Sequence, residues 1–194
     1  TSPRSGIGKS YSFTFQFKVD STAPTMNNVS TSSTGKYTNS STYVYASDSM
    51  SGVDAIYMKT PGSSSYGNMG TSTTVSSSGT NGLYSFYAKD KAGNISRTYF
   101  LYLDTVKPTG TIKNSNGAEI TGSYTNQAFS YSATDSGSGI SYLQYKKPGS
   151  SSWLTYTSGT SISASAASGT YQFRSVDKAG NISATKSITL DSSK

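Results

Sequence analysis

The sequence contains no cysteine and no histidine among its 194 residues. Without cysteine, the chain can form neither a disulfide framework nor a thiolate metal site. Without histidine, it lacks the side chain that most often serves as a general base in enzymes. Charged residues make up only 13% of the chain, and no apolar run approaches the roughly 18 residues of a membrane-spanning helix. These absences argue against many classes of enzyme and against a transmembrane segment.

Serine, threonine, glycine and tyrosine fill the space that charged and aliphatic residues leave. Tyrosine and threonine favour strands, whereas serine and glycine favour turns. The chain also has 16 Tyr, 7 Phe and one Trp, which is too many aromatic residues for a disordered chain. The net charge of +7 comes from Lys and Arg that are scattered along the sequence, which is typical of a solvated surface. We therefore expect a folded all-β protein with no nucleic-acid partner.

The heptapeptide DKAGNIS occurs twice, at residues 90–96 and 177–183. Longer segments match at the same offset of 87 residues, and a shorter pair matches upstream at an offset of 84. The matching pairs are 37–66 with 124–153, 81–96 with 168–183, and DSTAPT (20–25) with DTVKPT (104–109). This self-similarity predicts two tandem repeats, at residues 20–103 and 104–191.

Each repeat alternates apolar and polar residues in short segments that are separated by Gly, Pro, Asn and Ser, which indicates an antiparallel β-sandwich. Residues that stay apolar in both copies are expected to face the core. In the first copy this inward set is Thr42, Val44, Ala46, Ile56, Met58, Tyr84, Phe86, Leu101 and Leu103. In the second copy it is Phe129, Tyr131, Ala133, Leu143, Tyr145, Tyr171, Phe173, Ile188 and Leu190.

The segments ATDSGSGI (133–140), SGTYQF (168–173) and DKAGNIS, in that order, resemble bacterial immunoglobulin-like repeats. The resemblance covers residues 20–191 and implies two seven-strand sandwiches in tandem. It also implies a tyrosine-corner hydrogen bond from Tyr84 and from Tyr171. DKAGNIS would then form the turn between the sixth and seventh strands, where Gly and Asn accept positive φ. The family implies a secreted or cell-surface bacterial protein.

Residues 11–20 align with the ends of the two repeats, at 97–104 and 184–191. We therefore interpret residues 1–19 as carrying the last strand of a preceding, truncated repeat. Its alternating residues would form an apolar face, namely Phe13, Phe15, Phe17 and Val19. We expect this strand to pair either with the first repeat or with another molecule.

Seven of the nine acidic residues are equivalent between copies. In a sandwich of this kind, Asp104, Asp135 and Asp177 should gather at the junction between the repeats. Asp20, Asp48 and Asp90 should gather in the same way at the start of the first repeat. Such carboxylates can bind calcium, as in cadherin-like arrays, or cap turns.

Two features favour the capping role for these acids. Lys91 and Lys178 are adjacent to two of them, and the ligand spacing Asp-x-Asp does not occur. The sequence thus predicts no metal and no cofactor. It also predicts no enzymatic activity, because no carboxylate pair, histidine or cysteine suggests a catalytic site.

Four aromatic residues are expected to point outward from the strands of the first repeat: Tyr57, Tyr87, Phe100 and Tyr102. The second repeat has Gln144, Arg174, Ser187 and Thr189 at the same positions. An aromatic patch would bind a glycan or a protein, although tyrosine is also simply a good strand former.

The sequence therefore supports two hypotheses of function. The first is a non-catalytic spacer or adhesion module of an extracellular or surface-anchored bacterial protein, whose partners are neighbouring repeats. The alternative is a carbohydrate-binding module that uses the aromatic face, within a larger glycan-active enzyme.

Overall fold

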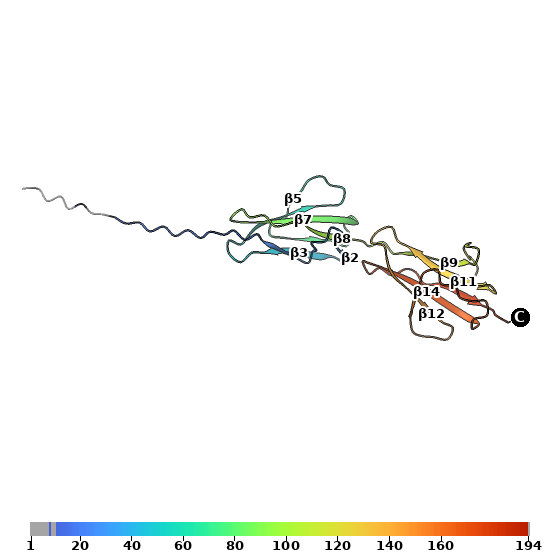
Figure 1. The fold of residues 1–194 in the computed structure, drawn as a ribbon. Coiled ribbons are helices and arrows are strands. Elements are labelled where there is room, and N and C mark those ends of the chain that lie inside the picture. The colour runs from blue at the N-terminus through green and yellow to red at the C-terminus, as the bar shows by residue number, and fades with distance from the viewer. Residues whose placement is uncertain (1–7, 9–10, 194) are drawn as a thin grey trace, which may run out of the picture.

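The computed structural model describes residue 8 and residues 11–193 (Figure 1). Within these residues the chain forms fifteen β-strands and no helix. The all-β prediction is confirmed. Since the described part of the chain has no helix, it also has none that could cross a membrane.

The first repeat consists of two sheets with the strand orders β1-β3-β6 and β2-β8-β7-β4-β5. β2 and β8 run parallel, and the other neighbours run antiparallel. The strands are β1 (Thr25–Asn27), β2 (Lys36–Thr38), β3 (Thr42–Ser47), β4 (Val53–Lys59), β5 (Gly67–Asn68), β6 (Ser72–Val75), β7 (Gly82–Asp90) and β8 (Tyr99–Leu103).

The second repeat has the same layout, with the strand orders β11-β9 and β10-β15-β14-β12-β13. Here β10 runs parallel to β15. The strands are β9 (Thr109–Asn114), β10 (Tyr124–Thr125), β11 (Phe129–Thr134), β12 (Ile140–Lys146), β13 (Leu154–Tyr156), β14 (Gly169–Asp177) and β15 (Lys186–Leu190). Two facing sheets in this arrangement are consistent with an immunoglobulin-like or fibronectin III-like fold.

The two copies differ in one strand. The expected seven strands occur in the second repeat, whereas the first repeat has eight. The extra strand is β6, which pairs with β3. The equivalent segment of the second repeat, 159–162, makes the isolated bridge between Phe129 and Ile162 and one hydrogen bond from the Gly159 N–H to the Tyr131 carbonyl, but it forms no strand. This segment starts with Gly159 at a φ of 76°, which is incompatible with the extended backbone of a strand.

Each repeat has its own hydrophobic core between its two sheets. In the first, Val44 of β3 packs against Phe86 of β7 and Leu101 of β8, all 0% exposed. In the second, Tyr131 of β11 packs against Phe173 of β14. The inward sets that the sequence predicts for β3, β4, β7 and β8 and their equivalents are confirmed, apart from the half-buried Thr42, which lies at the start of β3.

Both predicted tyrosine corners are present. The Tyr84 hydroxyl donates to the Thr80 carbonyl at 2.9 Å, and the Tyr171 hydroxyl donates to the Ala167 carbonyl at 3.1 Å. These bonds tie the loop before β7 and the loop before β14 to the strand that follows each of them. They hold one end of each sandwich in place without a disulfide.

The repeats lie end to end (Figure 1), and Asp104 is hydrogen-bonded to both of them. The Asp104 N–H donates to the Thr38 carbonyl of the first repeat at 2.9 Å. The Tyr102 hydroxyl reaches the Gly137 carbonyl of the second repeat at 3.5 Å. The Nζ atom of Lys178 lies 5.7 Å from the centroid of the Tyr37 ring. Hydrogen bonds and a cation–π contact therefore join the two sandwiches directly.

The expected strand at residues 11–19 does not form within this chain. The segment is extended and makes no strand pairing with the first repeat, from which it projects (Figure 1). Phe13, Phe15 and Phe17 are 80%, 76% and 85% exposed. Pairing with the first repeat is thus wrong as a prediction, because the sheets of this repeat contain only strands that follow residue 24.

Candidate functional site

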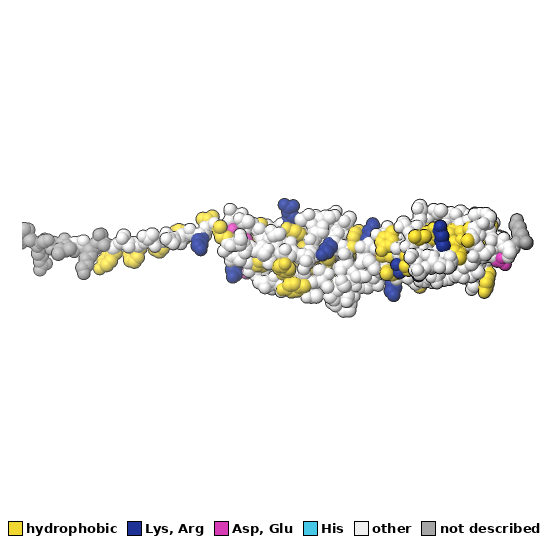
Figure 2. Space-filling view, turned by 90° about the horizontal axis from the view of Figure 1, so that it is seen from below, with side chains coloured by type: hydrophobic (Ala, Val, Ile, Leu, Met, Phe, Trp, Pro, Cys, Tyr) yellow, Lys and Arg dark blue, Asp and Glu magenta, His cyan; other side chains and the backbone are white. Residues whose placement is uncertain are grey.

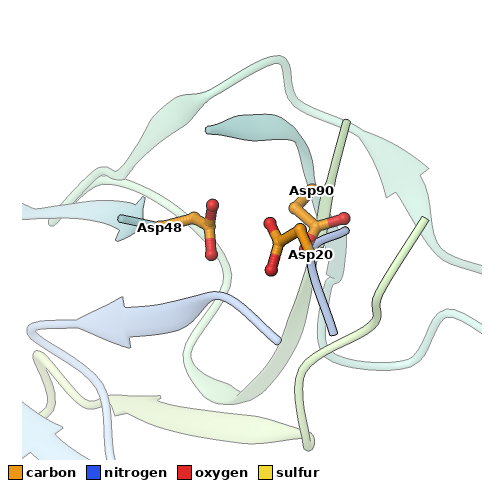
Figure 3. A group of neighbouring side chains, drawn as sticks. All are labelled: Asp20, Asp48 and Asp90. Carbon is orange, nitrogen blue, oxygen red and sulfur yellow. The ribbon is translucent and has the colours of Figure 1, made fainter. Parts of the chain in front are cut away.

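Three carboxylates from three separate segments meet at the start of each repeat. In the second repeat, Asp104 lies in the linker, Asp135 follows β11 and Asp177 ends β14. In each cluster, one oxygen from each of the three carboxylates lies within 4.8 Å of the other two. Figure 3 shows the equivalent cluster of the first repeat, in which the Asp48 side chain faces those of Asp20 and Asp90. The structure thus brings together both sets of acids that the sequence placed at one end of each sandwich.

Asp135 caps the loop after β11 with only one of its oxygens. Its Oδ1 atom accepts hydrogen bonds from the N–H groups of Gly137 at 3.1 Å and Gly139 at 2.8 Å. Its Oδ2 atom is buried and has no hydrogen-bond donor. The same is true of Asp48, whose Oδ1 accepts from Met50 and Gly52 and whose Oδ2 is buried without a partner.

Asn181, from the second DKAGNIS motif, connects the other two acids. Its backbone N–H donates to Asp177 Oδ1 at 2.8 Å, and its side-chain amide donates to Asp177 Oδ2 at 2.8 Å. The same amide donates to the backbone carbonyl of Asp104 at 2.8 Å. Asn94 makes the three equivalent bonds to Asp90 and Asp20. In each repeat the motif therefore hydrogen-bonds the entering chain segment to the end of the sixth strand, which gives a structural reason for its repetition.

The interpretation of this asparagine as a positive-φ residue is wrong. In each motif it is the glycine that has a positive φ, of 99° at Gly93 and 94° at Gly180. The asparagine acts through its side chain, which no turn propensity could reveal. The motif's serine also contributes, because the hydroxyl of Ser183 accepts from the Ser175 N–H at 2.9 Å.

Asp104 is fully buried at the junction. Its carboxylate accepts hydrogen bonds from the N–H groups of Val106 at 3.0 Å and Ser138 at 2.6 Å. Gly137 is required here, because a Cβ atom at this position would collide with the Asp104 carboxylate. The first repeat has Met50 at the equivalent position, and Asp20 is correspondingly only half-buried.

Hydrogen bonds stabilise the ionised carboxylate of Asp20. Hydrogen bonds from Ser51 and from the Thr22 N–H lower the pKa of Asp20 below its ordinary value. Lys178, which the sequence suggests as a compensating charge, instead reaches the Tyr37 ring of the first repeat. The carboxylates of both clusters are held by neutral amides, and carboxylate oxygens are the ligands that a hard cation such as calcium prefers.

The four predicted outward aromatic residues do not form one patch. Tyr57 and Tyr87 stack on each other with ring centroids 4.7 Å apart, and Tyr66 packs edge-on against Tyr87 at 4.9 Å. Tyr102 instead packs against Tyr37 near the junction, at 5.5 Å. All four predicted residues, including Phe100, are only half-exposed.

At the equivalent surface of the second repeat, cation–π contacts replace the stacked tyrosines. Trp153 occupies the position of Tyr66, with Arg174 4.2 Å and Lys146 4.8 Å from the centroid of its ring. Arg174 also donates to Gln144 at 2.9 Å. In one copy Tyr57 of β4 stacks on Tyr87 of β7, and in the other Lys146 of β12 and Arg174 of β14 lie over the Trp153 ring. The protein's own side chains therefore cover this part of each sheet.

Comparison with known proteins assigns no family. No family model matches the chain, and no curated protein matches it. A solved structure to which it is similar is described as that of Clostridium thermocellum CbhA fibronectin(III)-like modules. That structure is 15% identical, with 86% of this chain and 92% of the other covered and a TM-score of 0.40.

Proposed function

We propose that this chain is a non-catalytic spacer or adhesion module of an extracellular or cell-surface bacterial protein. The observation that carries the proposal is the end-to-end arrangement of the two sandwiches around a linker residue, Asp104, that is hydrogen-bonded to both. A spacer must hold a fixed distance, and a junction with direct bonds does so better than a flexible linker. Repeats of this kind place a partner or an activity at the far end of an array.

The surface chemistry supports a non-catalytic role. A pocket of about 490 Å³ on the second repeat is lined mainly by serine, threonine, tyrosine and alanine, and Asp48, Asp191 and Glu119 each line a different pocket, so that no two of them are paired in one. Figure 2 shows lysine and arginine scattered singly over the face that it displays. The aromatic rings that could form a glycan platform are stacked on one another or on cations. The spacer hypothesis is therefore favoured over the carbohydrate-binding alternative.

Distance measurement between the repeats tests this function. Because the chain has no cysteine, spin labels can be placed on Ser64→Cys and Ser151→Cys, which are exposed and equivalent in the two copies. Pulsed electron paramagnetic resonance should give one narrow distance distribution. A variant with a Gly-Ser insertion between Leu103 and Asp104 serves as the flexible control and should broaden it.

The opposite result would contradict the spacer function. If the unmodified junction gives a distribution as broad as that of the insertion variant, the repeats are not held at a fixed separation. A single distance much shorter than an end-to-end arrangement allows would indicate that the repeats fold back on each other, which is also incompatible with a spacer.

A further inference from the structure

We propose that each carboxylate cluster binds a calcium ion: Asp104, Asp135 and Asp177 at the junction, and Asp20, Asp48 and Asp90 at the start of the first repeat. This goes beyond the spacer function, which does not require a metal. It also replaces the sequence-based expectation that these acids only cap turns.

The first argument is the charge that the junction cluster places in the protein interior. Asp104 is 0% exposed and Asp177 is 2% exposed. Every hydrogen bond to Asp104, Asp135 and Asp177 comes from a neutral amide. Amide dipoles stabilise one carboxylate each, but they do not cancel the repulsion between three carboxylates within 4.8 Å of one another. A bound cation would cancel it.

The second argument is an oxygen that capping leaves unexplained. The Oδ2 atom of Asp135 exposes less than 1 Å² and has no hydrogen-bond donor. A buried acceptor without a partner is rare in proteins and costly. Because Oδ1 is already occupied by two N–H groups, Oδ2 is the oxygen that is free to bind an ion.

The third argument is that the unpaired oxygen recurs in the other copy. Asp48 Oδ2 is also buried without a donor, although the neighbouring residue is Met50 there and Gly137 in the second repeat. The surroundings have thus changed between the copies, whereas the three acids and the free oxygen have not. A shared ligand accounts for this better than two coincidental defects.

The kind of ligand suits calcium better than magnesium. The ligand atoms of each cluster lie within 4.8 Å of one another, close enough for one ion to contact all three carboxylates. Calcium accepts several carboxylates in irregular arrangements. Magnesium keeps most of its water and usually takes only one or two carboxylates.

Asp135→Asn and Asp48→Asn are the variants that test the sites. Asparagine keeps a carbonyl oxygen for the two backbone N–H groups and replaces the free oxygen with an NH₂ group, so the cap survives while the ligand is lost. Asp54→Asn is the matched control, because Asp54 is exposed on β4 and belongs to neither cluster. The full chain is stripped with a chelator and titrated by calorimetry with calcium chloride, and separately with magnesium chloride.

We expect two calcium ions per chain for the wild type and for Asp54→Asn, one for each single cluster variant, and none for the double variant. Calcium should raise the melting temperature of the wild type. In chelator, Asp135→Asn should be at least as stable as the wild type, since it removes one of three neighbouring carboxylates. In calcium it should be less stable.

Three results would overturn the proposal. One is the absence of calcium binding by the wild type at millimolar concentration. Another is a stoichiometry that the two cluster variants do not change. The third is magnesium binding that equals or exceeds calcium binding, which would refute the assignment to calcium.

Discussion

At the scale of single residues, the side-chain amide of Asn181 connects two segments of the second repeat. It holds the Asp104 carbonyl, which begins the second repeat, against Asp177, which ends β14. Asn181 is 8% exposed, whereas Asn94 in the first repeat is half-buried. A buried hydrogen-bonded group is costly to remove, because its partners then lack a donor and are also shielded from water.

We therefore predict that Asn181→Ala destabilises the second repeat by about 1–3 kcal/mol. Urea unfolding followed by tryptophan fluorescence measures this repeat alone, because Trp153 is the only tryptophan of the chain. Asn116→Ala, at an exposed loop position, is the control. Asn94→Ala should leave the fluorescence transition unchanged while it destabilises the first repeat. An unshifted transition for Asn181→Ala would mean that the amide bonds contribute nothing net.

At the scale of elements, β7 and β14 each contain, at the third position, a buried tyrosine whose hydroxyl closes the tyrosine corner. Burial raises the pKa of Tyr84 and of Tyr171 above the ordinary value of 10.0. Burial also raises the pKa of Tyr156. A raised pKa means that the fold favours the neutral phenol. The resulting stability is fully present below the unfolded-state pKa and is lost as pH rises through the folded-state pKa.

We predict that these tyrosines ionise only as the β-structure unfolds at alkaline pH. Ultraviolet absorbance of tyrosinate, recorded together with circular dichroism, should show a late phase that coincides with the loss of structure. In the Tyr84→Phe, Tyr171→Phe double variant this late phase should shrink. Ionisation of all 16 tyrosines in one phase, with the fold intact, would contradict the prediction.

The strand register was predictable because the two repeats of the chain can be compared with each other position by position. Positions that stay apolar in both copies, such as Tyr84 with Tyr171 and Phe86 with Phe173, all lie in the cores. The extra strand β6 of the first repeat was not predicted, because the equivalent segment 159–162 of the second repeat forms no strand. Propensity over a short segment cannot separate a strand from a bend when the neighbouring sheet supplies most of the stability.

The candidate site was predictable only in part. Topology alone indicated that the loop after β11 and the end of β14 meet at the junction, which placed Asp135 beside Asp177. The unpaired oxygen of Asp135 and the reach of the Asn181 amide depend on side-chain directions that a sequence does not encode locally. For the same reason the sequence did not predict that Tyr102 packs against Tyr37 and not against Tyr57, since contacts on one face of a sheet depend on the distances between side chains.

At the scale of the whole molecule, residues 11–19 remain an exposed apolar segment. Its alternating phenylalanines match the pattern of β8 and β15, and burying them would contribute several kcal/mol at about 25 cal/mol per Å². An exposed segment with this pattern is a candidate for pairing with another chain.

We predict that the chain self-associates through this segment. Sedimentation velocity should show a larger species at high protein concentration, and the variant Phe13→Ser, Phe15→Ser, Phe17→Ser should abolish it. The control Thr14→Ser, Gln16→Ser changes only the intervening polar positions and should still associate. A wild type that stays monomeric throughout would refute this prediction.

The parallel pairing of β2 with β8, and of β10 with β15, has a mechanical consequence. If the two ends of a repeat are pulled apart, β2 is drawn toward the N-terminal side and β8 toward the C-terminal side. The two strands run in the same direction, so this force acts along their length and strains all the hydrogen bonds between them at once. The bonds cannot open one after another, as they would if the strands were peeled apart. Each sandwich is thus arranged to resist extension along the axis on which the repeats are joined.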